Sequence, residues 1–256
     1  MNPILIIGQN TIKALIRKKD FYVFFIMLVV LMIVLNLQNF YDIKGISRFI
    51  KESGYSATWV FSFILATIFT SKQLIEEANN KTIYSLLSKP VSLLHIVLGR
   101  YLGSILSVSV AFSVFYVFYI FSISFRGEGI GVLLIFQGYF LGVLFLSMAC
   151  AVALLLSLLL TYSAAVTFSF ILYFVVVILS EPLRAVTLNA QGFLKYLLHF
   201  IYYILPHYEF YDIGIRIVHG WQALPMWVVF AVTIYTAVFV SVILFFCHLI
   251  INKRIF

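Results

Sequence analysis

Long apolar runs separated by short polar segments set the pattern of this chain. A transmembrane helix needs about 20 mainly apolar residues to cross a hydrocarbon core of roughly 30 Å. Six runs meet or approach that length: residues 21–37, 55–70, 94–125, 130–160, 163–179 and 226–251. The first two are short, and we expect their helices to extend into the flanking polar residues. The pattern predicts an all-α integral membrane protein whose six transmembrane helices form one transmembrane domain, residues 1–256.

The composition agrees with a membrane protein and excludes an ordinary soluble domain. Hydrophobic residues make up 64% of the chain and charged residues 10%, whereas soluble domains carry about 25% charged residues. No cleavable signal peptide is expected, because no small-residue cleavage site follows the basic cluster at residues 13–19. Cys150 and Cys247 fall inside predicted spans, where we expect packing residues and no disulfide.

The distribution of lysine and arginine orients the predicted helices, because cationic residues accumulate on the cytoplasmic side of membrane proteins. With six spans and both termini inside, ten of the 17 Lys and Arg residues lie in inside segments. Counting the acidic residues gives a net charge of +7 inside and +1 outside, which together make the +8 of the chain. Orientation in a membrane therefore accounts for the basic charge, and no nucleic-acid partner is expected.

Two segments have the character of helices that lie on a membrane surface. Residues 4–19 place apolar side chains on one face and polar ones on the other, as in helices that bind at the headgroup boundary. Four cations there would meet membrane lipid: Lys13, Arg17, Lys18 and Lys19. Residues 192–205 are apolar, but 14 residues reach only roughly 21 Å as a helix. We expect an interfacial or re-entrant helix there, within an extracytoplasmic segment at residues 181–225.

A polar insert, residues 74–92, separates the second predicted span from the third. A short amphipathic helix fits it, with Ile83, Leu86 and Leu87 on one face. Ser88-Lys89-Pro90 would end this helix, because proline disfavours helical geometry in the residue before it. The pattern alone fits two interpretations equally: a surface helix that only anchors the loop, and a docking helix for a water-soluble partner.

Pairs of glycines four residues apart occur in two of the predicted spans. Gly99 and Gly103 form the first pair, and Gly138 and Gly142 form the second. This spacing allows two helices to approach closely. Packing within one protomer and a seam between two protomers both fit, and we favour the first.

Candidate catalytic chemistry is sparse. His207, Glu209 and Asp212 could form a carboxylate–histidine metal site, but their spacing matches no standard pattern, and polar residues at a helix break are the preferred interpretation. An intramembrane enzyme would need His, Asp or Ser partners at one depth, and no such cluster can be assembled from the sequence. Ionisable residues are nearly absent from the span interiors, which argues against an ion-coupled carrier and favours an apolar or amphipathic path.

The polar insert and the start of the third span carry three groups of residues with a familiar order: Glu76-Glu77, then Lys81-Thr82 with residues 86–92, then Leu98-Gly99-Arg100. They resemble the acidic stretch, Gly-Thr, Leu-Leu-Ser-Lys-Pro-Val-Ser-Arg and Leu-Gly-Lys signature of type-2 ABC-transporter permeases. Residues 10–19 and 205–212 are similar to the start of that family and to its segment before the last span. Two positions depart from the signature, with Lys81 in place of Gly and Leu93 in place of Arg.

The resemblance implies a permease subunit with no enzymatic activity of its own. It implies six helices per protomer, a second permease protomer (identical or not), and separate cytoplasmic ABC ATPase subunits that bind ATP and Mg²⁺. This chain has no G-x-x-x-x-G-K-[ST] phosphate loop with which to bind ATP itself. The insert would be the coupling helix, and the expected ATPase contacts are Glu76, Glu77, Lys81, Thr82, Tyr84, Leu86, Leu87, Ser88, Lys89 and Pro90. No catalytic, cofactor-binding or metal-binding residue is expected.

The same resemblance implies a bacterial inner membrane, with both termini in the cytoplasm. Two functions are compatible with it. The first is an exporter subunit, and the second is a membrane scaffold or assembly subunit that does mechanical work without moving a solute. An intramembrane enzyme is the third and least favoured possibility.

Overall fold

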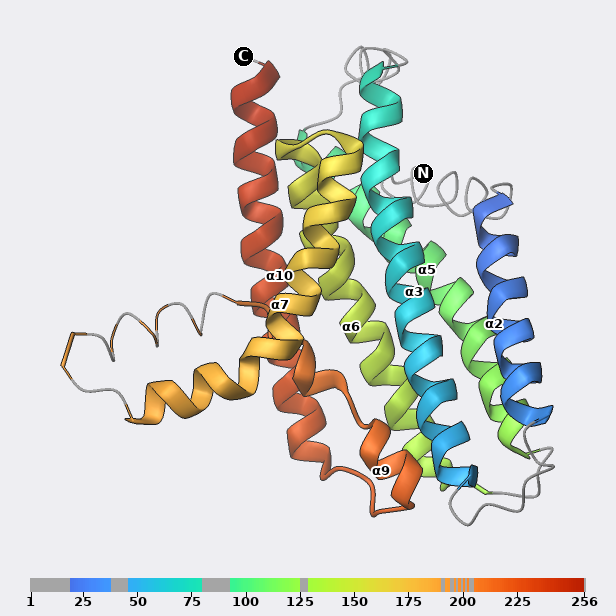
Figure 1. The fold of residues 1–256 in the computed structure, drawn as a ribbon. Helices are drawn as coiled ribbons and strands as arrows, with labels where there is room; N and C mark the ends of the chain where they lie inside the picture. The colour runs from blue at the N-terminus through green and yellow to red at the C-terminus, as the bar shows by residue number, and fades with distance from the viewer. Residues whose placement is uncertain are drawn as a thin grey trace.

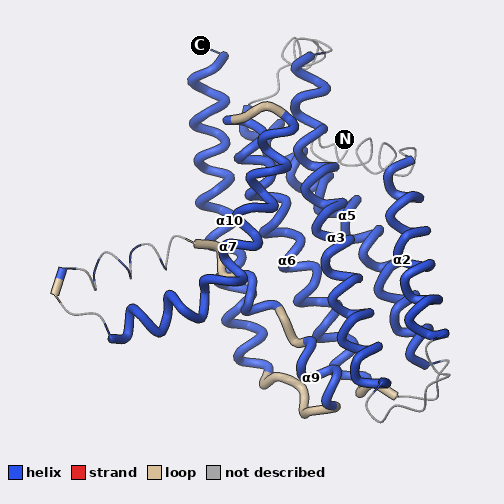
Figure 2. The backbone as a smooth tube through the Cα atoms, viewed as in Figure 1, coloured by secondary structure: helices blue, strands red, loops and turns tan. Residues whose placement is uncertain are grey.

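The computed structural model is a bundle of helices that stand side by side (Figure 1). It describes residues 19–37, 46–79, 93–124, 129–189 and 205–255, and positions 192, 193, 196, 198, 200 and 202. Within those residues the chain forms helices and loops and no strand (Figure 2). The helices are α2 (Lys19–Leu37), α3 (Ile46–Asn79), α5 (Leu93–Ser124), α6 (Val132–Leu159), α7 (Tyr162–Asn189), the 3-10 helix η2 (Tyr208–Tyr211), α9 (Gly214–His219) and α10 (Met226–Ile255).

The predicted all-α class is confirmed, and within the described residues five helices are long and apolar enough to cross a membrane. Their apolar segments are Arg48–Lys72, Leu94–Ser124, Val132–Leu159, Tyr162–Ser180 and Met226–Lys253. The first predicted span corresponds to a shorter apolar helix, Phe21–Val34, within α2. The extension of the second span into polar sequence is confirmed, since α3 begins at Ile46 and continues to Asn79. These five helices mark the chain as an integral membrane protein.

α6 is the central helix of the bundle. It packs against α3, α5, α7 and α10, and Figure 1 shows it among them. Many of its buried residues are small: Gly138, Gly142, Ala149, Ala151 and Ala153. In lipid, helices associate largely through close packing, which small residues permit. The composition of α6 therefore explains its central place.

The helix termini gather at two opposite ends of the bundle. Figure 1 places the C-terminal turns of α3 and α10 at one end, and α9 with the first turns of α3 at the other. We call the first the insert end, because the polar insert follows α3 there, and the second the α9 end. The C-terminal turns of α3, which precede the insert in the sequence, and those of α10 therefore lie at the same end of the bundle.

α7 continues as a helix beyond the end of its apolar segment. That segment, Tyr162–Ser180, agrees with the run predicted at residues 163–179, and the helix continues through Pro182 to Asn189. Proline inside a helix removes one hydrogen bond and kinks the chain, and Figure 1 shows the end of α7 turning away from the bundle. Beyond it, the described positions 193, 196, 198, 200 and 202 are helical. The interfacial helix at 192–205 stays a prediction, as does the segment boundary at residue 181.

The predicted N-terminal surface helix lies almost entirely outside the described residues. Lys13, Arg17 and Lys18 belong to that part, and Lys19 is the first residue of α2.

Candidate functional site

The insert end holds part of the predicted ATPase contact. Glu76 and Glu77 lie in the last turns of α3, which continues seven residues past Lys72, the end of its apolar segment. At 1.5 Å per residue, this is about 10 Å of helix beyond that segment. The other expected contact residues, Lys81 to Pro90, lie outside the described residues, so the docking assignment stays a prediction.

The two helices that flank the insert are tied to the centre of the bundle. α3 packs against both α5 and α6. Near the start of α5, the Tyr101 hydroxyl lies 2.7 Å from the Ser147 hydroxyl of α6 and shares a hydrogen bond with it. Tyr101 is buried, as is Arg100 beside it. A displacement of either flanking helix would therefore also displace α6.

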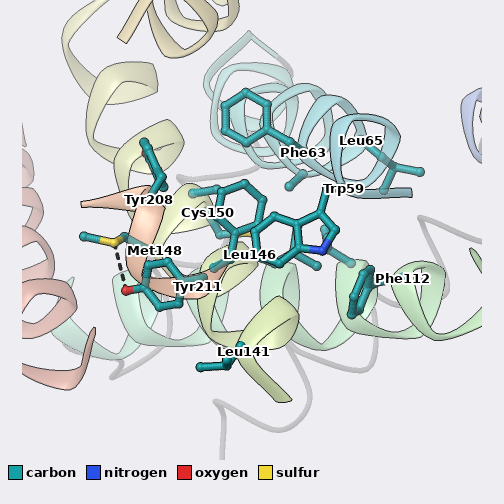
Figure 3. Close-up of a cluster of buried hydrophobic side chains, with 14 of the residues drawn as sticks. Trp59, Phe63, Leu65, Phe112, Leu141, Leu146, Met148, Cys150, Tyr208 and Tyr211 are labelled. Carbon is teal, nitrogen blue, oxygen red and sulfur yellow. Dashed lines mark hydrogen bonds between the residues drawn. The ribbon is translucent and has the colours of Figure 1, made fainter. Parts of the chain in front are cut away.

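Further along the bundle, an aromatic cluster joins α3 to α6, α7 and η2, and Figure 3 shows Trp59, Phe63 and Tyr208 of this cluster. Trp59 of α3 lies 4.4 Å from Phe145 of α6, measured between ring centroids. Phe63 lies 4.4 Å from Tyr173 of α7, and Phe145 lies 5.4 Å from Tyr208 of η2. Such ring pairs add packing energy beyond the burial of their area. The cluster is a continuous contact from α3 to the segment before the last span.

The short helix η2 is held in the bundle by a buried tyrosine. Tyr211 is fully buried, and its hydroxyl lies 3.1 Å from the Met148 sulfur and 2.8 Å from the Thr236 hydroxyl of α10 (Figure 3). Burial raises the pKa of the Tyr211 hydroxyl above its ordinary value, so the group keeps its proton and can donate. Tyr211 thereby links α6 to α10.

The residues weighed as a metal site are only partly brought together. Nδ1 of His207 lies 3.8 Å from Oε1 of Glu209. The imidazole is buried, and neither of its nitrogens has a hydrogen-bond partner among the residues that the structure describes. Burial lowers the pKa of His207, while the nearby Glu209 carboxylate acts in the opposite direction. Within the described part of the chain, no group of three or more His, Cys, Asp or Glu side chains could hold a metal ion.

Sequence reasoning missed a polar clamp on α6. The Gln137 side chain donates to the Leu224 carbonyl and accepts from the Leu224 N–H, both at 2.8 Å. These bonds fix the loop that leads into α10. A signal was present, since a glutamine inside an apolar run needs partners when it is buried, but the sequence does not say where those partners lie.

The second glycine pair sits at a close contact within the protomer. A Cβ atom on Gly142 would lie 2.4 Å from Cζ of Phe112, and one on Gly138 would lie 2.6 Å from the Tyr116 hydroxyl oxygen. Both partners belong to α5, so these glycines let α5 approach α6. The first pair, Gly99 and Gly103, is buried in α5.

Taken together, the described contacts form a mechanical connection. It runs from the helices that flank the insert, through α6 and the aromatic cluster, to η2 and to Thr236 of α10. Comparisons with known proteins add no family: no protein-family model matches the chain, and no curated protein matches it.

Proposed function

We propose that this chain is the membrane subunit of an ATP-binding-cassette exporter, driven by a separate cytoplasmic ATPase that docks on the insert between α3 and α5. Six crossings per protomer, two protomers per transporter and a bacterial inner-membrane location belong to the same proposal. ATP and Mg²⁺ would bind to the partner subunits. The carrying observation is the shape of α3, which extends about 10 Å past its apolar segment and ends at the polar insert.

The arrangement of α3 suits it to act as a lever. Its last turns contain Glu76 and Glu77, and its apolar part packs against α2, α5, α6, α7 and α9. Such a helix would extend beyond the bilayer and pack tightly within it. A force applied at its C-terminal end would therefore be transmitted to the helices that contact it. Closure of two ATPase subunits on ATP would supply that push.

Rigid-body movement of helix groups would then change access to the membrane interior, a known mode of switching. The Tyr101–Ser147 hydrogen bond connects α6 to α5, and the Trp59–Phe145 contact connects it to α3. Movement of α5 and α3 would therefore be coupled to movement of α6. Tyr211 couples α6 to α10. The last crossing would thus move with the first helices to be pushed.

The interior of the bundle favours an apolar or amphipathic cargo. Many buried hydroxyls bond to carbonyls of their own helix, as Ser62, Ser107 and Thr236 do. A carrier of ions normally places ionisable groups at depth, and the sequence has few there. α7 and α10 bury the smallest share of their apolar segments, so lipid and the second protomer would cover them.

Copurification of the ATPase tests the proposal. Leu86→Asp with Leu87→Asp should abolish binding of the ATPase while the protein still inserts in the membrane, because two charges would replace the apolar face of the docking helix. The matched control is Val132→Asp with Leu133→Asp, which alters two exposed residues at the start of α6, at the α9 end. The control should keep the ATPase. Retained binding in the Leu86/Leu87 variant would remove the docking assignment.

A transport assay in vesicles then decides between export and mechanical work alone. ATP-dependent movement of a lipid or amphipathic probe, lost in the Leu86/Leu87 variant, is the expected result. ATPase binding without movement of any probe would favour the scaffold function instead.

A further inference from the structure

A small pocket opens at the α9 end of the bundle, between the first turns of α3 and the segment around α9. Its volume is about 100 Å³, and it is lined by Glu52, Tyr55 and Ser56 of α3 together with Asp212, Gly214, Ile215, Val218 and His219. One wall is polar and the other is apolar. This volume has room for ordered water or for a small organic group.

Two carboxylates share the polar wall without a basic partner. Both Glu52 and Asp212 reach solvent, and among the described residues neither forms an ion pair with Lys, Arg or His. Oδ1 of Asp212 accepts a hydrogen bond from the Gly214 N–H at 2.7 Å, which fixes the carboxylate. Burial and the charge of Glu52 raise the pKa of Asp212, while the Gly214 N–H lowers it. The pocket therefore concentrates negative charge in a chain of net charge +8.

A third acceptor comes from an unpaired buried hydroxyl. Tyr55 is 3% exposed, and its hydroxyl has no hydrogen-bond partner of good geometry among the described residues, although the Ile213 backbone lies near it. Leaving such a group unpaired in the interior is unfavourable. A Cβ on Gly214 would lie 2.9 Å from Cδ1 of Tyr55 and 3.0 Å from Oδ1 of Asp212. A glycine at this position thus lets the tyrosine ring and the carboxylate come together at one point.

We propose that this pocket binds a primary ammonium group, with Glu52, Asp212 and the Tyr55 hydroxyl as its three acceptors. An ammonium carries three N–H donors and a positive charge, so it matches the three oxygens and neutralises the carboxylates. Ile215 and Val218 provide an apolar wall for a short alkyl chain. A metal ion fits less well, because calcium takes six to eight oxygen ligands and only two carboxylates are available here.

This ligand chemistry has two possible sources, an amine in solution and the ethanolamine headgroup of a membrane lipid. The pocket lies at the end of a candidate span, where a headgroup can reach it. The inference does not depend on the proposed ATPase docking, which concerns the opposite end of the bundle.

Calorimetric titration of the purified full-length chain in detergent tests the site, with ethanolamine as the probe. We expect binding, and we expect choline to bind at least about tenfold more weakly because it has no N–H donor. Asp212→Asn and Glu52→Gln should each weaken ethanolamine binding at least about tenfold. Tyr55→Phe should weaken binding without lowering the unfolding temperature, since it removes only an unpaired hydroxyl. Glu209→Gln, which removes a carboxylate outside the pocket, should leave binding unchanged.

Native mass spectrometry identifies the source. Retention of phosphatidylethanolamine over phosphatidylcholine, lost in Asp212→Asn, would assign the site to the lipid headgroup. Ethanolamine binding without that lipid preference would assign it to a soluble amine. The proposal is overturned if neither probe binds, if Ca²⁺ or choline binds as well as ethanolamine, or if Asp212→Asn binds like the unaltered chain.

Discussion

α6 and α7 follow one another in the chain and are similarly apolar, yet they occupy opposite environments. In the most apolar window of each helix, 72% of α6 is buried within the protein and 22% of α7. Hydropathy alone does not separate them. What differs is side-chain size, because glycines and alanines recur along α6, whereas α7 exposes bulky residues such as Phe168, Ile171 and Phe174.

The difference shows what each kind of sequence signal reports. Hydropathy reports whether a helix can enter the bilayer, and small residues report whether other helices can close around it. α6 satisfies both conditions and became the centre of the bundle. α7 satisfies the first and leaves most of its surface to lipid or to another protein. Substitutions placed in pairs, one on each helix, can break or sharpen this comparison.

The largest expected contrast comes from truncating one phenylalanine on each helix. Phe145 of α6 is 1% exposed and lies against the rings of Trp59 and Tyr208, whereas Phe168 of α7 is 53% exposed. Phe145→Ala should lower the free energy of unfolding by about 3–5 kcal/mol, because it leaves a cavity. Phe168→Ala should change it by no more than about 0.5 kcal/mol. Denaturant titration in mixed micelles measures both, and equal losses would show that α6 is not the packing centre.

A glycine on α6 tests the close approach of α5. Gly142→Ala should destabilise the protein by about 1–3 kcal/mol, because the new Cβ would meet the Phe112 ring. In an open helix the same change favours folding, since glycine weakens helices, so the sign itself is informative. Combining it with Phe112→Leu makes room and should recover part of the loss in the same titration. A stabilising Gly142→Ala would mean that α5 and α6 are farther apart.

A third contrast compares polar groups. Gln137→Leu removes both hydrogen bonds to Leu224 and should cost about 1–2 kcal/mol. Thr167 of α7 donates to the Ser163 carbonyl of its own helix at 2.9 Å and is exposed. Thr167→Val should therefore be nearly neutral, within about 0.5 kcal/mol. Proteolysis of the loop at 221–225 gives an independent measure, because that loop should be cut faster in Gln137→Leu alone.

Much of the fold could be predicted from the sequence, for reasons visible in α3 and α10. Each contains a long apolar segment. In a bilayer such a segment forms a helix, because a helix satisfies all of its backbone hydrogen bonds internally. The continuation of α7 past Pro182 could not be predicted from the sequence. Proline ends most helices, and whether a helix continues through it depends on the surrounding contacts. Whether α2 crosses the membrane was harder to predict, because its apolar stretch, Phe21–Val34, is shorter than a typical transmembrane span.

The candidate site was predictable only in part. The insert is recognisable because its motif is local in the sequence. The contacts that position α5 and the loop before α10 are not local, since Tyr101 of α5 bonds to Ser147 across 46 positions and Gln137 bonds to Leu224 across 87. Such pairs depend on which helices are neighbours, and hydropathy carries no information about that. The hydrogen-bond partners of Tyr211 could not be predicted for the same reason.

The smallest expected effect concerns the segment that returns to the bundle after α7. His207 is buried among the rings of Tyr202, Phe210 and Tyr235, and Glu209 is the charged group beside it. Burial lowers its pKa below the ordinary value of 6.5, so the folded protein favours the neutral imidazole. The unfolded chain binds the proton more readily, and stability must therefore fall as the pH drops through 6.5 toward the folded-state pKa. Above pH 6.5 the contribution is complete.

His207→Phe keeps an aromatic ring in this cluster and removes the titration. Its unfolding midpoint should fall less than that of the unaltered chain between pH 7 and pH 5, when both are measured in the same detergent. Glu209→Gln should enlarge the fall, because it removes the carboxylate that favours the protonated ring. The groups that all three proteins share contribute equally to each, so their contributions cancel in the comparison. Superimposable pH profiles for the unaltered chain and His207→Phe would contradict the burial of this imidazole. They would mean that water reaches His207 and that the segment after α7 is as exposed as α7 itself.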